Sequence, residues 1–170
     1  MKWKTCKRCS NPCFCGKLGE PNEACSCTPT MIERYRRRLS GPLLDRIDLH
    51  IEVPRVPHRE LADPIDAESS ATIRTRVEAA RRIQNQRLAP FGLYANARMG
   101  ARQIRKFCPV DDAGEKLLEM VTERLGLSAR TYSRILKVAR TIADLEGEEN
   151  IHQGHLAEAI QYRGLDRKIR

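Results

Sequence analysis

From residue 68 onward the apolar residues recur every three or four positions, which is the period of an amphipathic helix. Capping residues and glycines separate the repeats. We predict helices over residues 68–88, from a cap at Asp111 or Asp112 to Leu125, from Ser128 to Gly147 and near 153–163, with a short helix near 100–107. The simplest arrangement is a cluster of four antiparallel helices over residues 68–165.

Two shorter patterns precede these helices. Thr28 followed by Pro29 is typical of a helix start and predicts a helix over residues 28–39. Over residues 47–53 apolar and polar residues alternate, which predicts a strand with one buried face. Prolines after this strand indicate a linker over residues 58–67.

Composition limits the class of partner. The 170-residue chain carries 31 Lys and Arg against 22 Asp and Glu, a net charge of +9. This balance favours a phosphate-bearing partner such as DNA, although a solvated basic surface is the alternative. No apolar run is long enough for a membrane span, and the N-terminus lacks the apolar segment of a signal peptide. We therefore expect a cytoplasmic protein with no membrane partner.

Six of the seven cysteines lie between Cys6 and Cys27. Disulfides are rare in the cytoplasm, and four thiolates around one loop suit a tetrahedral Zn²⁺ site. The Cys-x-Cys spacing is tighter than the usual Cys-x2-Cys of zinc sites. A turn-rich loop with reduced thiols and an iron–sulfur cluster are the alternatives.

Two arginines stand out by their positions. Arg46 comes just before the predicted strand, where it could reach a phosphate across a subunit boundary; a surface pair with Asp45 or Asp48 is the alternative. Arg130 lies in the first turn of a predicted helix, where the helix dipole disfavours a cation. Such a break with a local rule points to function, and a solvated arginine is again the alternative. No segment fits the G-x-x-x-x-G-K-[ST] loop that holds ATP phosphates.

Several motifs carry a family resemblance over residues 11–167. They are Asn11-Pro12-Cys13-Phe14-Cys15-Gly16, Cys25-Ser26-Cys27-Thr28-Pro29, Ile32-x-x-Tyr35, LSGPLLDRIDLHIEVP from Leu39, LGLSARTY from Leu125, RILKVARTIADL from Arg134 and HLAEAIQYR from His155. Together they resemble the magnesium-chelatase-related AAA+ ATPases of the YifB/ComM type.

The resemblance implies a hexameric, ring-forming ATPase that uses ATP and Mg²⁺. It implies like subunits and DNA as partners, and helicase and branch-migration activity in natural transformation. By the same resemblance Asn11 is the sensor 1 residue that orients the attacking water, Arg46 is an arginine finger acting in trans, and Arg130 is a sensor 2 residue contacting the ATP phosphates in cis. The Cys pairs that resemble a small zinc-binding insertion are Cys13, Cys15, Cys25 and Cys27.

The resemblance also implies the fold class and the domain order. We predict a mainly α chain in which residues 1–57 are the Cys-rich loop, short helix and strand that end an AAA+ α/β core. Residues 58–67 are the linker, and residues 68–170 are a helical lid bundle. The P-loop would lie upstream of Met1, as in a truncated or frameshifted reading frame, so we expect no ATP turnover by this chain alone. The alternative function is a non-catalytic, zinc-stabilised basic module that binds DNA.

Overall fold

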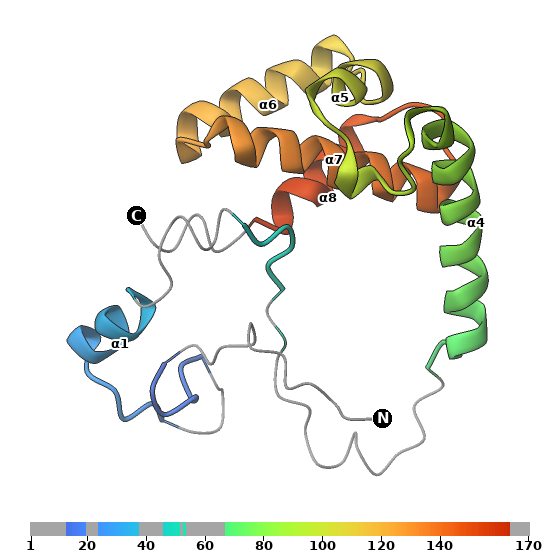
Figure 1. Ribbon diagram of the computed structural model, residues 1–170. Helices are drawn as coiled ribbons and strands as arrows, with labels where there is room; N and C mark the ends of the chain where they lie inside the picture. The colour runs from blue at the N-terminus through green and yellow to red at the C-terminus, as the bar shows by residue number, and fades with distance from the viewer. Residues whose placement is uncertain (1–12, 20–23, 38–45, 52, 54–66, 164–170) are drawn as a thin grey trace.

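The computed structural model describes residues 13–19, 24–37, 46–51, 53 and 67–163 (Figure 1). The helices are α1 (Pro29–Arg36), α4 (Ser70–Leu88), α5 (Ala101–Phe107), α6 (Asp112–Leu125), α7 (Ala129–Glu146) and α8 (Gln153–Gln161), with 3-10 turns η1 (Ala89–Phe91) and η2 (Asn96–Arg98). The described residues contain no strand, and the predicted mainly α fold is confirmed. No helix in this part of the chain has the length and apolar character to cross a bilayer.

Helix α7 is the centre of the bundle. Helices α4, α5 and α8 and the turn η2 all pack on α7, and α6 packs on α8. The buried core between them includes Leu88, Met99, Ile104, Leu118, Ile135, Ala139 and Leu156. Burial of each larger side chain contributes about 1.5–3 kcal/mol to folding. The bundle thus contains the four helices of the predicted cluster and the predicted short helix α5, which also packs on α7.

The predicted helix caps are present. The side chains of Asp111 and Ser128 accept hydrogen bonds from backbone N–H groups three residues ahead, at 2.8 and 3.2 Å, and so begin α6 and α7. Gly126 and Gly147 adopt the left-handed conformation, with φ of 55° and 79°, where these two helices end. Local sequence therefore sets the ends of both helices.

A buried polar network joins α4 to α7. The carboxylate of Asp144 pairs with Arg87 of α4, and it accepts hydrogen bonds from Arg140 Nε at 3.1 Å and Asn96 Nδ2 at 2.7 Å. Arg140 also donates to two carbonyl oxygens in the turn after α7, at 2.5 and 2.6 Å. A carboxylate is tolerated in a core when it is paired and hydrogen-bonded in this way.

The strand predicted over residues 47–53 is not found in the described part of that segment. Its expected buried face is open to solvent, since Leu49, Ile51 and Val53 are 45%, 65% and 83% exposed. A strand needs a ladder partner, and the described residues provide no second strand. The segment lies along the bundle instead, with the backbone N–H of His50 donating to the carbonyl of Tyr162 at 2.7 Å.

Helix α4 extends beyond the other bundle helices at its N-terminal end (Figure 1). Its C-terminal half is packed, with Ala80, Gln84 and Leu88 buried. Ile73 and Val77 recur at helical spacing with Ala80, but they are 41% and 43% exposed. The apolar face of α4 thus continues past the core that the described residues form.

Candidate functional site

Four cysteine side chains meet at one point just ahead of α1. The Sγ atoms of Cys13, Cys15, Cys25 and Cys27 all lie within 4.8 Å of one another. Cys13 Sγ is 3.4 Å from Cys15 Sγ and 3.7 Å from Cys25 Sγ, and the last two sulfurs are 3.5 Å apart. These distances exceed a disulfide bond of about 2.05 Å. They are close to the roughly 3.8 Å between sulfurs that tetrahedral Zn²⁺ requires with Zn–S bonds of about 2.3 Å.

Local structure brings the two cysteine pairs together. Gly16, with φ of 77°, turns the chain after the first pair, and its N–H donates to the carbonyl of Cys13 at 3.2 Å. The ring of Phe14 packs edge-on against Tyr35 of α1, with the centroids 4.8 Å apart. Thr28 follows the second pair directly and caps α1. Both pairs are therefore anchored to the same short helix.

Backbone N–H groups, burial and neighbouring sulfurs shift the pKa values of the thiols in this cluster. The N–H of Lys17 lowers the pKa of Cys15 to about 5, against the effect of burial, with help from the thiols of Cys13 and Cys25. The N–H of Cys27 acts in the same direction on Cys25, but burial and the neighbouring sulfurs outweigh it and raise the pKa of Cys25 to about 12. The thiol of Cys15 therefore ionises far more readily than that of Cys25.

Arg130 lies in the first turn of α7 and is exposed to solvent. It lines a cavity of about 680 Å³ between α7, α8 and the segment around Leu49, together with Arg134 and Lys137 from the same helix. Burial, followed by the charge of Arg134, lowers the pKa of Lys137, whose Nζ donates to the carbonyl of Ala97 at 3.2 Å. The remaining wall is largely apolar but includes the carboxylates of Asp48, which pairs with Arg134, and of Glu158, which accepts a hydrogen bond from Tyr162. An anion in this cavity would therefore bind at the Arg130 end, with an apolar group against the rest of the wall.

Arg46 is exposed, and the residues that follow it are attached to the bundle. The carbonyl of Ile47 accepts a hydrogen bond from the buried guanidinium of Arg163. Asp48, which the sequence offers as a surface partner of Arg46, forms an ion pair with Arg134 of α7. The base of the Arg46 segment is therefore fixed to the helices.

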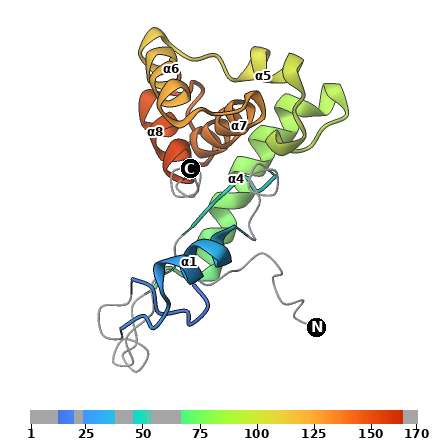
Figure 2. The same ribbon diagram turned by 90° about the vertical axis from the view of Figure 1, so that its left-hand side faces the viewer.

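The candidate residues fall into two places in the molecule. The cysteine cluster and α1 lie apart from the bundle in Figure 1, and in Figure 2 they lie away from α5, α6, α7 and α8, although α1 overlaps α4 in that view. Arg130 belongs to α7 of the bundle itself. Asn11, the expected sensor 1 residue, lies outside the described residues, as do Cys6 and Cys9. Most of the expected linker, residues 58–67, also lies outside them.

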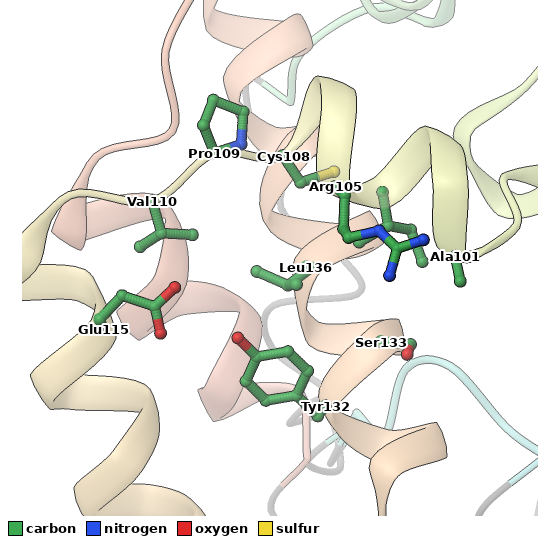
Figure 3. Close-up of a pocket in the computed structure, with 10 residues that line it drawn as sticks. Ala101, Arg105, Cys108, Pro109, Val110, Glu115, Tyr132, Ser133 and Leu136 are labelled. Atoms are coloured by element: carbon green, nitrogen blue, oxygen red, sulfur yellow. The ribbon is translucent and has the colours of Figure 1, made fainter.

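A second cavity, of about 390 Å³, opens between α5, α6 and α7 (Figure 3). Glu115 and Tyr132 face each other across it. Burial, and then the charge of Glu115, raises the pKa of Tyr132, and burial raises the pKa of Cys108 to about 11. Both groups are therefore neutral at neutral pH, so the cavity contains no activated nucleophile among them. Sequence reasoning missed it because three separate helices, with no shared motif, supply its walls.

Comparison with known proteins adds an independent line of evidence. Residues 67–163 match the family described as magnesium chelatase, subunit ChlI C-terminal, and residues 6–61 match magnesium chelatase, subunit ChlI. The chain is 46% identical over 143 residues to the competence protein ComM of Haemophilus influenzae, covering 84% of this chain and 27% of ComM. It is 45% identical over 144 residues to YifB of Salmonella typhimurium, covering 84% and 28%. A relative in Mycobacterium tuberculosis is 34% identical over 154 residues, covering 91% and 30%. The chain thus spans less than a third of each relative.

Proposed function

This chain belongs to the magnesium chelatase family of ChlI subunits, and we propose that it supplies the arginine-finger segment and the helical lid of a ComM- and YifB-like AAA+ ATPase. The chain spans 27% of ComM and 28% of YifB, and we propose that the catalytic assembly includes more than residues 1–170. This sequence contains no G-x-x-x-x-G-K-[ST] loop, and the groups that cradle the ATP phosphates must come from elsewhere in that assembly.

The observation that carries the proposal is the row of cations on α7. Arg130, Arg134 and Lys137 line one cavity, and Arg130 stands at the helix N-terminus, where the dipole opposes its charge. A bound phosphate would relieve this repulsion, and a guanidinium can donate two parallel hydrogen bonds to it. Arg130 is thus our candidate for the sensor 2 contact to the ATP phosphates of its own subunit.

Arg46 is the candidate arginine finger. Its side chain is exposed, while Ile47 and Asp48 immediately after it are bound to Arg163 and Arg134. An exposed guanidinium on an anchored backbone suits contact with the γ-phosphate bound by a neighbouring subunit. A ring of like subunits would place each Arg46 at the next ATP site.

The described residues fit ATP phosphates and Zn²⁺ better than they fit Mg²⁺. Their one cluster able to hold a metal consists of thiols, whereas Mg²⁺ prefers carboxylate and water oxygens. We therefore place Mg²⁺ elsewhere in the assembly and give it no ligand in this chain. For Asn11 we keep the sensor 1 role that the family resemblance implies, as a prediction.

Zn²⁺ is the metal that we propose for the cysteine cluster. Cys13, Cys15, Cys25 and Cys27 supply four sulfurs within 4.8 Å of one another, and the first three are 3.4–3.7 Å apart. Four thiolates close the coordination sphere and leave no position for a reactive water, so the role of the metal is structural. The ion would hold the two cysteine pairs together beside α1.

A chimera tests the nucleotide roles. In H. influenzae ComM, the segment that matches this chain over 143 residues is replaced by the matching segment of this chain. Steady-state ATP hydrolysis is then measured, and assembly is followed by light scattering. Loss of an arginine finger lowers the rate by about 10³–10⁵, so we expect Arg46→Ala to abolish turnover and Arg130→Ala to weaken ATP binding. Arg76→Gln, which breaks an exposed ion pair with Glu68, is the matched control. Full turnover in Arg46→Ala would contradict the proposed finger, and unchanged ATP binding in Arg130→Ala would contradict the proposed sensor 2 contact.

Subunit mixing tests whether Arg46 acts in trans. Arg46→Ala subunits keep a competent ATP site, and subunits with an inactivated P-loop lysine keep a competent finger. A mixed ring then contains interfaces with one intact site facing one intact finger. We expect ATP hydrolysis to return on mixing, whereas a finger that acts in cis would give no recovery.

For the intact protein we propose ATP-driven helicase activity in DNA branch migration, as the family resemblance implies. The basic composition, with a net charge of +9, supports DNA as the partner. Unwinding and branch-migration assays with the chimera test this step separately from ATP hydrolysis. An ATPase that is active but leaves branched DNA unchanged would restrict the proposal to the nucleotide roles.

The second candidate is a zinc-stabilised module that binds DNA without catalysis. It rests on the four exposed arginines of the extended helix α4, of which Arg76 is paired with Glu68; the other three are Arg74, Arg81 and Arg82. Fluorescence anisotropy of labelled duplex DNA, titrated with the 170-residue chain at several salt concentrations, tests it. Neutralising two phosphate-binding arginines with Arg81→Ala and Arg82→Ala is expected to reduce the log–log salt slope by about two. No binding at low salt would exclude this candidate.

A further inference from the structure

One ion pair links the two arginines to which the proposed function assigns ATP. Arg134 lies one helical turn after Arg130 on α7, and its partner Asp48 lies two residues after Arg46. We propose that Asp48 and Arg134 are positioning residues that hold the arginine finger on the lid, so that the finger and the sensor 2 arginine move as one body. This inference rests on the proposed function and names how its two sites are coupled.

The segment after Arg46 is held to the lid at successive positions. The carbonyl of Ile47 accepts from Arg163. Asp48 pairs with Arg134. The N–H of His50 donates to the carbonyl of Tyr162 at 2.7 Å. Since α7 and α8 are themselves packed together, these contacts fix the segment to a rigid pair of helices.

Among these contacts the Asp48–Arg134 pair joins two side chains, and the others use a backbone group of the segment. Its side chains are 53% and 22% exposed. An ion pair this open to solvent adds little to folding stability. Its effect would therefore be seen in the placement of Arg46, and not in the stability of the bundle.

The link has a consequence for a ring of subunits. Arg130 would contact the phosphates bound by its own subunit, and Arg46 would contact the γ-phosphate bound by the next. If a change at the first site shifts α7, the pair carries the same shift to the finger at the second site. Asp48 and Arg134 would then couple hydrolysis at neighbouring ATP sites.

A first experiment uses the 170-residue chain by itself. Exchange of the His50 backbone amide is followed by NMR in the wild type, in Asp48→Asn, in Arg134→Gln and in the charge swap Asp48→Arg with Arg134→Asp. We expect about two- to fivefold faster exchange in each single variant, because the segment opens locally more often when an ion pair of this exposure is lost, and recovery in the swap. Arg76→Gln, which breaks the exposed pair with Glu68, is the control. Unchanged exchange in both single variants would overturn the inference.

A second experiment measures ATP hydrolysis by the ComM chimera carrying the same variants. Misplacing a catalytic group by about 1 Å lowers turnover up to about 100-fold, so we expect kcat to fall 10- to 100-fold in Asp48→Asn with little change in KM. The swap should restore most of kcat, and the cooperativity of the ATP dependence should fall in the single variants. If Arg134 binds ATP directly, Arg134→Gln raises KM and the swap fails to rescue, which also overturns the inference.

The two proposals fail in different ways. Full turnover in Arg46→Ala would contradict the proposed function itself. Loss of turnover in Arg46→Ala with unchanged kcat in Asp48→Asn would leave the finger in place and remove only the link. A chimera that assembles but does not hydrolyse ATP would contradict the proposed function, while exchange of the His50 amide still decides whether the pair holds the segment.

Discussion

The carboxylate of Asp144 on α7 is fully buried and pairs with Arg87, which lies 57 residues earlier at the end of α4. Arg140 and Asn96 complete the hydrogen bonding of the same carboxylate. Helix α4 thus reaches the bundle through a polar contact as well as through the buried side chains of its C-terminal half. The polar part of the connection between α4 and α7 depends on this one acidic group.

Asp144→Ala should be among the most destabilising single changes in the bundle. It leaves Arg87 and Arg140 in the core without their shared carboxylate, and breaking a buried pair costs about 3–5 kcal/mol. Urea unfolding followed by circular dichroism measures the free energy of unfolding. Arg76→Gln, which removes an exposed ion pair with Glu68, should change it by less than about 1 kcal/mol. Equal effects of the two variants would show that the network is not a stabilising feature.

A glycine pair in two helices offers a matched test of packing. A Cβ atom at Gly114 of α6 would meet Val110 Cγ1 and would lie 2.7 Å from Leu156 Cδ1, whereas one at Gly154 of α8 would have nothing within 4 Å. We expect Gly114→Ala to destabilise the bundle by about 1–3 kcal/mol through overpacking. Gly154→Ala should be neutral or stabilising by up to about 1 kcal/mol, because alanine favours the helix. Thermal unfolding of both variants gives the comparison, and a stable Gly114→Ala would show that α6 can shift away from α8.

His155 should contribute to the start of α8 through its ring. Its Nδ1 accepts the backbone N–H of His152 at 3.0 Å, and its Nε2 lies 2.8 Å from a carboxylate oxygen of Glu146. His155→Ala removes both contacts from a buried position, so we expect a loss of about 1–3 kcal/mol. His155→Gln keeps a side chain able to reach the same backbone N–H and should recover part of it. Differential scanning calorimetry of the three proteins tests this, and identical melting temperatures would contradict it.

Metal binding at the cysteine cluster should release protons. The pKa of Cys25 is raised to about 12, and that of Cys27 is raised above its usual range, so both are protonated at pH 7 without metal. Zn²⁺ binds thiolates, so uptake must displace at least these protons and the affinity must fall as the pH is lowered. Calorimetric titration with Zn²⁺ in buffers of different ionisation enthalpy counts the protons.

The matched variants for this titration are Cys27→Ser in the cluster and Cys108→Ser in the bundle. We expect the first to lose tight binding, because one of four ligands is removed, and the second to keep it. Chelation of the metal should loosen the loop beside α1 and leave the unfolding of the bundle unchanged. Uptake of Zn²⁺ with no release of protons would contradict the assignment of these thiols as ligands.

The helical half of the fold could be predicted from the sequence because its signals are local. Ser128 and Gly147 mark the ends of α7 by their own side chain and backbone conformation, whatever lies around them. The partner of Asp144 could not be predicted in this way, since Arg87 is far away in the chain and nothing in its neighbourhood marks it.

The candidate site shows the same division. The spacing of six cysteines indicated a metal site as one interpretation, the family resemblance singled out four of them, and the structure brings these four together beside α1. The apolar alternation over residues 47–53 predicted a strand that the described residues do not contain. The Asp48–Arg134 pair was missed because it depends on where that segment lies, and no periodicity encodes this.

Leu49, Ile51 and Val53 remain open to solvent although they recur with strand periodicity. An alternating apolar pattern is typical of a strand whose apolar face packs against another surface. In the described residues no such surface covers Leu49, Ile51 and Val53. When this chain is handled alone, these three residues are the place where a second molecule would attach. Concentration-dependent association in solution would therefore report on the missing contact and should disappear when these three positions are made polar.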